Sequence, residues 1–196
     1  MRNTAPFDFH EAMRVLLDAN IIITYLTQRA DNERGAVNQI FQYLRKGKLE
    51  GYVAFSSLAS AWYVMRHMDV AQRRKGLQEI LDLLQVAAAN TEAVRQAAAN
   101  DAFPDFEDNL QDCCAKEIHA DYIVTANLKD FVGHSQVPAI TPAGLLDLLQ
   151  LQSLLQTPPS PGEVRESPST YYYTHIVVTR LLPGSPEGHR HFLKTA

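Results

Sequence analysis

The chain has 196 residues, a length that favours one domain, or one domain with an appendage. Hydrophobic residues make up 46% and charged residues 20%, which excludes wholesale disorder, and no apolar run reaches the roughly 18 residues of a membrane span. The net charge of −4, from 18 basic and 22 acidic side chains, argues against binding of nucleic acid through bulk positive charge. It does not exclude a nuclease, because an enzyme that holds phosphates through metal ions needs local acids.

The predicted elements alternate between strands and helices. Short apolar runs bounded by turn residues are typical of buried strands, whereas apolar residues three or four apart, such as Val37, Ile40, Phe41 and Leu44, indicate a helix. We expect strand 14–18, helix 21–26, helix 32–44, strand 51–55, helix 56–67, helix 70–84, helix 92–100, helix 103–118, strand 121–125, strand 137–140 and helix 142–155. This order predicts an α/β fold with parallel strands and helices on both faces of the sheet.

Polar residues mark the starts of several of these helices. Ser56 or Ser57 can cap the helix after the second strand, and Thr91 can cap a later short helix. Thr141 is a predicted N-cap that precedes Pro142, and proline is favoured at the first helical position.

The two ends of the chain differ from its middle. Residues 1–12 form a leader whose acids and lack of an apolar stretch argue against a secretory signal. We expect a domain over 13–155, and then a Pro-rich linker and tail over 156–196. The tail holds one strand candidate, residues 171–180, and is too short to form a core alone.

The two cysteines, Cys113 and Cys114, are adjacent. Neighbouring residues of a helix point in different directions, so this pair cannot easily form a disulfide and lacks metal-ligand spacing. A reducing cytoplasm is therefore the expected location.

Oxygen-bearing side chains follow two of the predicted strands. Asp18 ends the first strand and Asn20 lies two residues further on. Thr125 ends a later strand, and Asn127 and Asp130 follow it. Because ligands bind at the carboxyl ends of the strands in an open parallel sheet, we expect these groups to converge at one edge.

A third acidic group opens the helix predicted over 103–118. Asp105 and Asp108 are one turn apart and share a helix face. Converging oxygens are the ligands that Mg²⁺ or Mn²⁺ prefers. Alternatively, Asp105 and Asp108 accept the free amides of the first turn, Asn20 and Asn127 only cap helices or shape turns, and Asp130 is a turn residue. Asp18 is harder to explain structurally, because a charge at the end of a buried strand is costly unless it is paired.

Four segments, taken in order, resemble the PIN domain family, in particular its bacterial branch related to VapC-type toxins. They are 15–20 (VLLDAN), 105–111 (DFEDNLQ), 120–131 (ADYIVTANLKDF) and 140–142 (ITP). The resemblance covers about residues 13–150. It implies a three-layer α/β/α fold around a small parallel sheet, here with a C-terminal extension. It also implies metal-dependent endoribonuclease activity by clustered acids with Mg²⁺ or Mn²⁺.

The resemblance also implies roles for individual residues. Asp18 matches the first acid of the family, and Asp108 matches the acid in the first turn of its acidic helix, where Asp105 can assist. These matches make Asp18 and Asp108 the expected metal ligands. Asn127 and Asp130 fall in the final motif, where the position of the acid varies within the family.

The sequence departs from the family at two positions. Ser60 stands where the second motif normally carries Asp or Glu, and Ala126 stands where this branch normally has Arg. A serine hydroxyl is a poorer ligand without negative charge, so metal affinity should fall. Ser60, like Asn20 and Asn127, is then expected to orient ligands or substrate.

Three functions remain open from the sequence. The first is a toxin-type endoribonuclease that acts on RNA and is inhibited by a cognate antitoxin. The resemblance implies that this protein forms a homodimer, and no membrane association is expected. The second is a weak or inactive PIN scaffold that binds nucleic acid or protein, for which Ser60 is the motivation. The third is a receiver-like domain with Asp18 as phosphoacceptor.

Overall fold

A central parallel sheet organises the part of the chain that the computed structural model describes, residues 12–29 and 32–156. Within these residues the sheet has five strands in the order β3-β2-β1-β4-β5. The strands are β1 (Met13–Leu17), β2 (Leu49–Ala54), β3 (Gln85–Ala87), β4 (Tyr122–Val124) and β5 (Ala139–Ile140). All of their pairings are parallel, as the alternation of strands and helices predicts. The predicted leader, apart from residue 12, and the strand candidate 171–180 lie outside the described residues.

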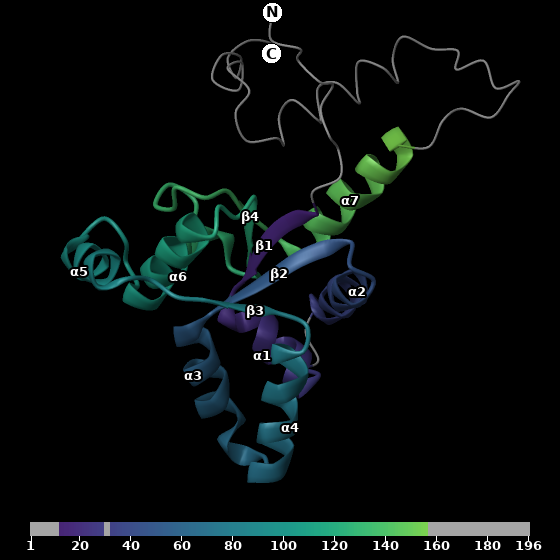
Figure 1. Cartoon of the computed structure of the whole chain (residues 1–196), viewed down its shortest axis with the longest axis horizontal. Helices are drawn as coiled ribbons and strands as arrows, with labels where there is room; N and C mark the ends of the chain where they lie inside the picture. The colour runs from purple at the N-terminus through teal and green to yellow at the C-terminus, as the bar shows by residue number, and fades with distance from the viewer. Residues whose placement is uncertain (1–11, 30–31, 157–196) are drawn as a thin grey trace, which may run out of the picture. The chain divides into compact units, whose positions relative to one another are not determined.

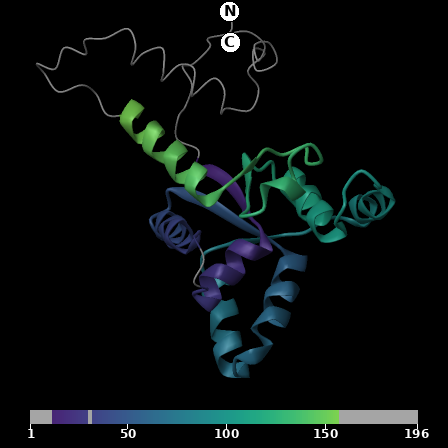
Figure 2. The ribbon, with the colours of Figure 1, turned by 180° about the vertical axis from the view of Figure 1, so that it is seen from behind.

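Helices connect the strands and flank the sheet. They are α1 (Ala19–Thr27), α2 (Arg34–Arg45), α3 (Phe55–Val64), α4 (Val70–Leu81), α5 (Thr91–Ala99), α6 (Phe106–Glu117), α7 (Pro142–Gln156) and the short 3₁₀ helices η1 (Met65–His67) and η2 (Leu128–Asp130). In Figure 1, α5 and α6 lie on one side of β1 and β2, and α2 lies on the other. Figure 2 shows this arrangement from behind, with α3 and α4 side by side beyond the sheet edge.

The alternation of side chains along the strands explains why both faces of the sheet are covered. Leu16 of β1 packs in a cluster with Ala115 of α6. Its neighbour Val15 pairs with Gly51 of β2, and a side chain on Gly51 would meet Leu44 of α2. Successive residues of β1 therefore pack against different helices, and the whole strand is apolar because both faces are buried.

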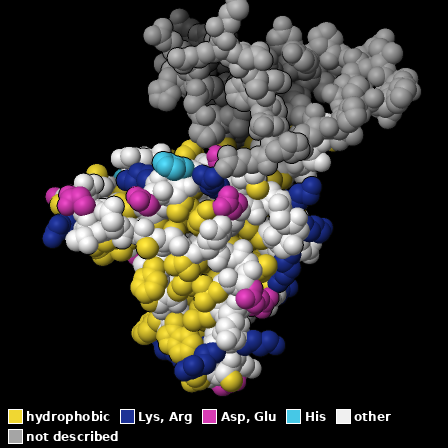
Figure 3. Space-filling view, viewed as in Figure 1, with side chains coloured by type: hydrophobic (Ala, Val, Ile, Leu, Met, Phe, Trp, Pro, Cys, Tyr) yellow, Lys and Arg dark blue, Asp and Glu magenta, His cyan; other side chains and the backbone are white. Residues whose placement is uncertain are grey.

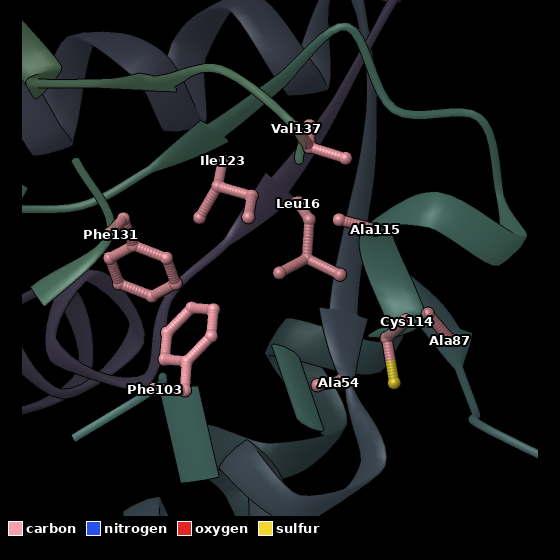
Figure 4. Packing of buried hydrophobic residues seen from close by; sticks show 9 residues of the cluster. All are labelled: Leu16, Ala54, Ala87, Phe103, Cys114, Ala115, Ile123, Phe131 and Val137. Carbon is pink, nitrogen blue, oxygen red and sulfur yellow. The ribbon is translucent and has the colours of Figure 1, made fainter. Parts of the chain in front are cut away.

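The core on the α6 side of the sheet is drawn in Figure 4. Leu16 and Ile123 come from adjacent strands and are fully buried. The rings of Phe103 and Phe131 meet edge to face, with centroids 6.2 Å apart. Phe103 precedes α6 and Phe131 follows η2, so this aromatic pair links two segments that carry predicted site residues.

Three local predictions need correction. Strand β3 was not predicted, because two of its three residues are exposed and it lacks an apolar run. Neither Ser56 nor Ser57 caps α3; helix α3 follows β2 directly, its N-cap is Ala54, and the serines lie inside the first turn. Helix α5 is capped by Asn90, whose side chain accepts from the Ala93 amide, because asparagine one position before Thr91 is the stronger cap.

The predicted start of α7 is confirmed, since Thr141 Oγ1 accepts from the Gly144 amide at 3.0 Å. Cys113 and Cys114 are both buried and free on α6. Among the described helices, none is both long and apolar enough to cross a bilayer. The chain divides into two units, residues 1–145 and 146–196, and the sheet belongs to the first.

Candidate functional site

Asp18 lies at the carboxyl end of β1, beside the end of β4. Its backbone amide donates to Val124 O at 3.0 Å, which joins the two strand ends. Asp18 is also the N-cap residue of α1, but its side chain does not cap that helix. The carboxylate is instead turned into the protein, where the residue is 4% exposed.

Three uncharged side chains donate to this buried carboxylate. Gln111 Nε2 donates to Asp18 Oδ1 at 3.0 Å, Thr125 Oγ1 donates to Oδ2 at 2.7 Å, and Asn20 Nδ2 makes a close contact with Oδ2. Within the described part of the chain, no lysine or arginine forms an ion pair with Asp18. Burial raises the pKa of Asp18, and the hydrogen bonds from Thr125 and Gln111 oppose this effect.

Asn20 joins the ends of the two strands. Besides its contact with Asp18, its Nδ2 lies 3.2 Å from Thr125 Oγ1, and its Oδ1 accepts from the Ala126 amide at 3.2 Å. This side chain therefore links the β1 and β4 ends, which is more than the local turn role that the sequence left open. Ala126, where the branch has arginine, contributes this amide and no side-chain charge.

Asn127 and Asp130 continue the same network. The Asn127 amide donates to Thr125 Oγ1 at 2.9 Å, and the Asn127 side-chain amide makes a close contact with Asp130 Oδ2. Asn127 is the N-cap of η2, and Asp130 is the last residue of that short helix. The tight 3₁₀ turn brings the Asp130 carboxylate back towards the strand ends.

The first turn of α6 carries the next acids. Asp105 is its N-cap, and Oδ1 accepts from the amides of Glu107 at 2.7 Å and Asp108 at 3.2 Å, so the structural role predicted for Asp105 is present. Burial, and then the charges of Asp18, Asp105, Asp130 and Glu107, raise the pKa of Asp108 from 3.8 to about 7. The charges of four other carboxylates therefore act on Asp108: Asp18 follows β1, Asp130 ends η2, and Asp105 and Glu107 belong to the start of α6.

Ser60 faces an acid from another helix. Its Oγ lies 2.8 Å and 2.9 Å from the two carboxylate oxygens of Glu107. Sequence reasoning missed Glu107, and it also missed Gln111, the buried donor to Asp18. Gln111 lies four residues after Glu107 and three after Asp108 on α6. This helical spacing was the available signal that Gln111 shares a face with these acids.

The chemistry of these donors fits a hard divalent cation. Asp18 and Asp108 supply carboxylate oxygens at a place where added positive charge would relieve both burial and repulsion. Among the described residues, no three His, Cys, Asp or Glu side chains form a ready-made metal cluster. Mg²⁺ commonly binds through one or two carboxylates and keeps several waters, so Asp18 and Asp108 could hold it without a third acid.

The surface near α3 is apolar. Figure 3 shows hydrophobic side chains gathered over the region where α3 lies in Figure 1. Phe55 and Tyr63 of α3 are 69% and 65% exposed. Two large aromatic residues this exposed on one helix are typical of an interaction surface.

The comparisons with known proteins agree with this architecture. The sequence model of the PIN domain family matches residues 14–129. No significant match is found among curated proteins. The structure is similar to VapBC2 from Rickettsia felis bound to a DNA fragment from its promoter, with a TM-score of 0.52, 15% identity, and coverage of 66% of this chain and 98% of that one. It also resembles Mycobacterium tuberculosis VapC20, a Sarcin-Ricin loop cleaving toxin, with a TM-score of 0.45, 13% identity, and coverage of 56% and 86%.

At these identities the structural similarity establishes a shared fold, and the family model accounts for more than half of the sequence. The matched segment contains Asp18, Ser60, Asp108 and Asn127, and it ends one residue before Asp130. The chain therefore belongs to the PIN domain family.

Proposed function

We propose that this protein is a metal-dependent endoribonuclease of toxin–antitoxin type that hydrolyses RNA phosphodiesters. The main supporting observation is the electrostatic environment of Asp108, whose pKa is raised by burial and by the charges of the acids Asp18, Asp105, Asp130 and Glu107. Carboxylates that repel one another persist where a cation or a function compensates for their cost. Membership of the PIN domain family supports the same chemistry by analogy.

In this proposal each residue has a defined task. Asp18 and Asp108 bind Mg²⁺ or Mn²⁺, which supplies an activated water and positive charge at the scissile phosphate. Asp130 and Asp105 add negative charge around the same position. Asn20 holds Asp18 against the end of β4, and Asn127 holds Asp130.

The direct test compares RNA cleavage by wild type and Asp18→Asn. We expect wild type to cleave single-stranded RNA in Mg²⁺ or Mn²⁺ and to lose cleavage in EDTA, and we expect Asp18→Asn to be inactive. The same substitution should abolish any growth arrest on expression. Unchanged cleavage by Asp18→Asn contradicts the proposal, because Asp18 is the buried carboxylate at the β1 end that the proposed metal site requires.

The proposed partners are RNA, a cognate antitoxin and a second copy of the chain in the cytoplasm. An antitoxin would cover the acidic group, and the exposed aromatic residues of α3 offer an apolar surface for pairing of two copies. The VapBC2 structure is a precedent for a partnered chain with this fold. Sedimentation of wild type and Tyr63→Glu tests the homodimer; we expect dimers for the former and monomers for the latter.

The second candidate function is a binding module on the PIN scaffold. It is favoured by Ser60 at the position of a family acid and by the lack of a three-acid cluster among the described residues. Failure to bind Mn²⁺ at millimolar concentration supports this candidate. Gain of ribonuclease activity in Ser60→Asp supports an attenuated nuclease instead. The receiver-like function has little support, because within the described residues no lysine pairs with Asp18.

A further inference from the structure

Basic side chains gather where α3 leads through η1 into α4. Residues 66–75 contain one acid, Asp69, and four of the 18 basic side chains of the chain. These four, which we call the basic patch, are Arg66, Arg73, Arg74 and Lys75. Helices α3 and α4 lie side by side, and Figure 3 shows Lys and Arg side chains around the apolar surface at their lower end. The net charge of the whole chain is −4, so this positive charge is a local feature.

Two arginines of the basic patch are held against aromatic rings. The guanidinium carbon of Arg66 lies 4.4 Å from the ring centroid of Tyr63, and that of Arg73 lies 3.6 Å from the ring centroid of Trp62. Arg73 Nη2 also donates to Trp62 O at 2.6 Å. Such contacts restrict the guanidinium groups in the free protein, so less side-chain freedom is lost when a ligand binds them.

The charges of the basic patch are not balanced by acids in the part of the chain that the structure describes. Over residues 12–29 and 32–156, none of its four side chains forms an ion pair. The nearby acid, Asp69, is the N-cap of α4 and accepts from the Gln72 amide at 2.9 Å. Arg66, Arg74 and Lys75 are exposed. These cations are therefore available to an anionic ligand.

The position of the patch on α4 also favours an anionic ligand. Helix α4 begins at Val70, Arg73 closes its first turn, and Arg74 and Lys75 follow. The amino end of a helix carries partial positive charge, so acidic side chains are favourable there and basic ones are not. The first turn of α4 contains no acid. A bound anion would offset this repulsion and accept charge-assisted hydrogen bonds from the arginines.

Helix α3 connects the basic patch to the acidic group of the candidate site. Ser60 of α3 contacts Glu107, the residue before Asp108. Arg66 lies six residues after Ser60, which corresponds to about 9 Å along a helix axis. A single-stranded polyanion that binds Arg66 can therefore continue to the acids.

We propose that the basic patch binds the phosphates of single-stranded RNA at a place separate from the acidic group. This inference rests on the proposed function for the identity of the ligand, because RNA is the proposed substrate. It deepens that function by naming residues that hold the RNA backbone while the acids carry out the hydrolysis. Phosphate contacts carry no sequence information, so we expect the patch to bind RNA of any sequence.

The test is fluorescence anisotropy of a short labelled single-stranded RNA with the full chain in EDTA, which prevents metal-dependent cleavage. If all four cations contact phosphates, the logarithm of the affinity should fall with the logarithm of the salt concentration with a slope of about −3. Arg66→Gln/Arg74→Gln should bind about tenfold more weakly and reduce the size of this slope by about 1.4, because each phosphate contact on a single strand contributes about 0.7.

A matched control removes two positive charges elsewhere. Lys46 and Lys48 follow α2 and are exposed, so Lys46→Gln/Lys48→Gln should bind RNA as wild type does. The test variant leaves Tyr63 and the apolar surface of α3 unchanged, and both of its substitutions are at exposed side chains. A loss of RNA binding in the test variant is therefore attributed to the removed charges.

The outcomes separate this inference from the proposed function. If wild type cleaves RNA and Arg66→Gln/Arg74→Gln binds it as wild type does, or the control loses as much affinity, only this inference is overturned. Displacement of the RNA by polyglutamate at equal charge concentration overturns RNA as the ligand in favour of an acidic protein. If wild type binds RNA through the patch but does not cleave it in Mn²⁺, this inference is supported and the nuclease is overturned. Absence of both binding and cleavage overturns both.

Discussion

Removal of the Asp108 charge should stabilise the metal-free protein at neutral pH. The pKa of this carboxyl rises from 3.8 to about 7 in the folded chain, because burial and four neighbouring carboxylates disfavour its charged form. The folded state then binds its proton more tightly than the unfolded state does. The group therefore costs nothing below about pH 4, its cost grows as pH rises towards 7, and the full cost is present above 7. Asp108→Asn removes this cost.

The size of the stabilisation expected for Asp108→Asn follows from the same rise in the pKa of Asp108. A rise of about three pH units corresponds to about 4 kcal/mol of differential interaction. Asp108 is only half-buried, so solvent screening lowers the stabilisation expected in Asp108→Asn to about 1–2 kcal/mol. For a chain of this length such a gain raises the melting temperature by about 2–8 °C.

The assay is urea unfolding of wild type and Asp108→Asn in EDTA at pH 4.5, 6 and 8. We expect the variant to be more stable at pH 8, less so at pH 6, and equal to wild type near pH 4.5. Asp101→Asn, at an exposed acid that is not among the charges acting on Asp108, is the control and should change little. A variant that is less stable at pH 8, or equally stabilised at every pH, would refute the reasoning.

Two further substitutions test the surroundings of the site by urea unfolding. Gly51→Ala should lower the free energy of unfolding by about 1–3 kcal/mol, because the added Cβ would lie under 3.0 Å from methyl carbons of both Leu44 and Leu84. A loss below about 0.5 kcal/mol would contradict this prediction and show that the sheet face around Gly51 is loosely packed. Thr125→Val should cost about 1–3 kcal/mol at pH 8, since it removes a donor to the buried Asp18 carboxylate, and the cost should shrink as Asp18 is protonated at low pH. A cost independent of pH would contradict this role.

Much of the fold was predictable because the central strands are buried on both faces. Val15, Leu16 and Leu17 are fully buried, and such a strand has to be a continuous apolar run that can be recognised in the sequence. Strand β3 carries no such pattern, because it pairs only with β2 at the sheet edge and exposes two of its three residues. Capping errors arose where adjacent residues compete, as Asn90 and Thr91 do before α5.

The candidate site was predictable only in part. Asp18 and Thr125 end adjacent parallel strands, so their proximity follows from topology once the strands are recognised. The pairing of Ser60 with Glu107 joins residues 47 apart through the packing of α3 against α6, and no local pattern encodes that contact. The roles assigned to Asp18, Asp108 and Asp130 stay predictions until metal binding is measured.

The most direct test of the account is a crystal of the full chain grown with Mn²⁺ and measured for anomalous scattering. The account predicts one Mn²⁺ peak within coordination distance of carboxylate oxygens of both Asp18 and Asp108. A map with no peak between these two side chains at saturating Mn²⁺ would contradict the claim that Asp18 and Asp108 bind the catalytic metal ion.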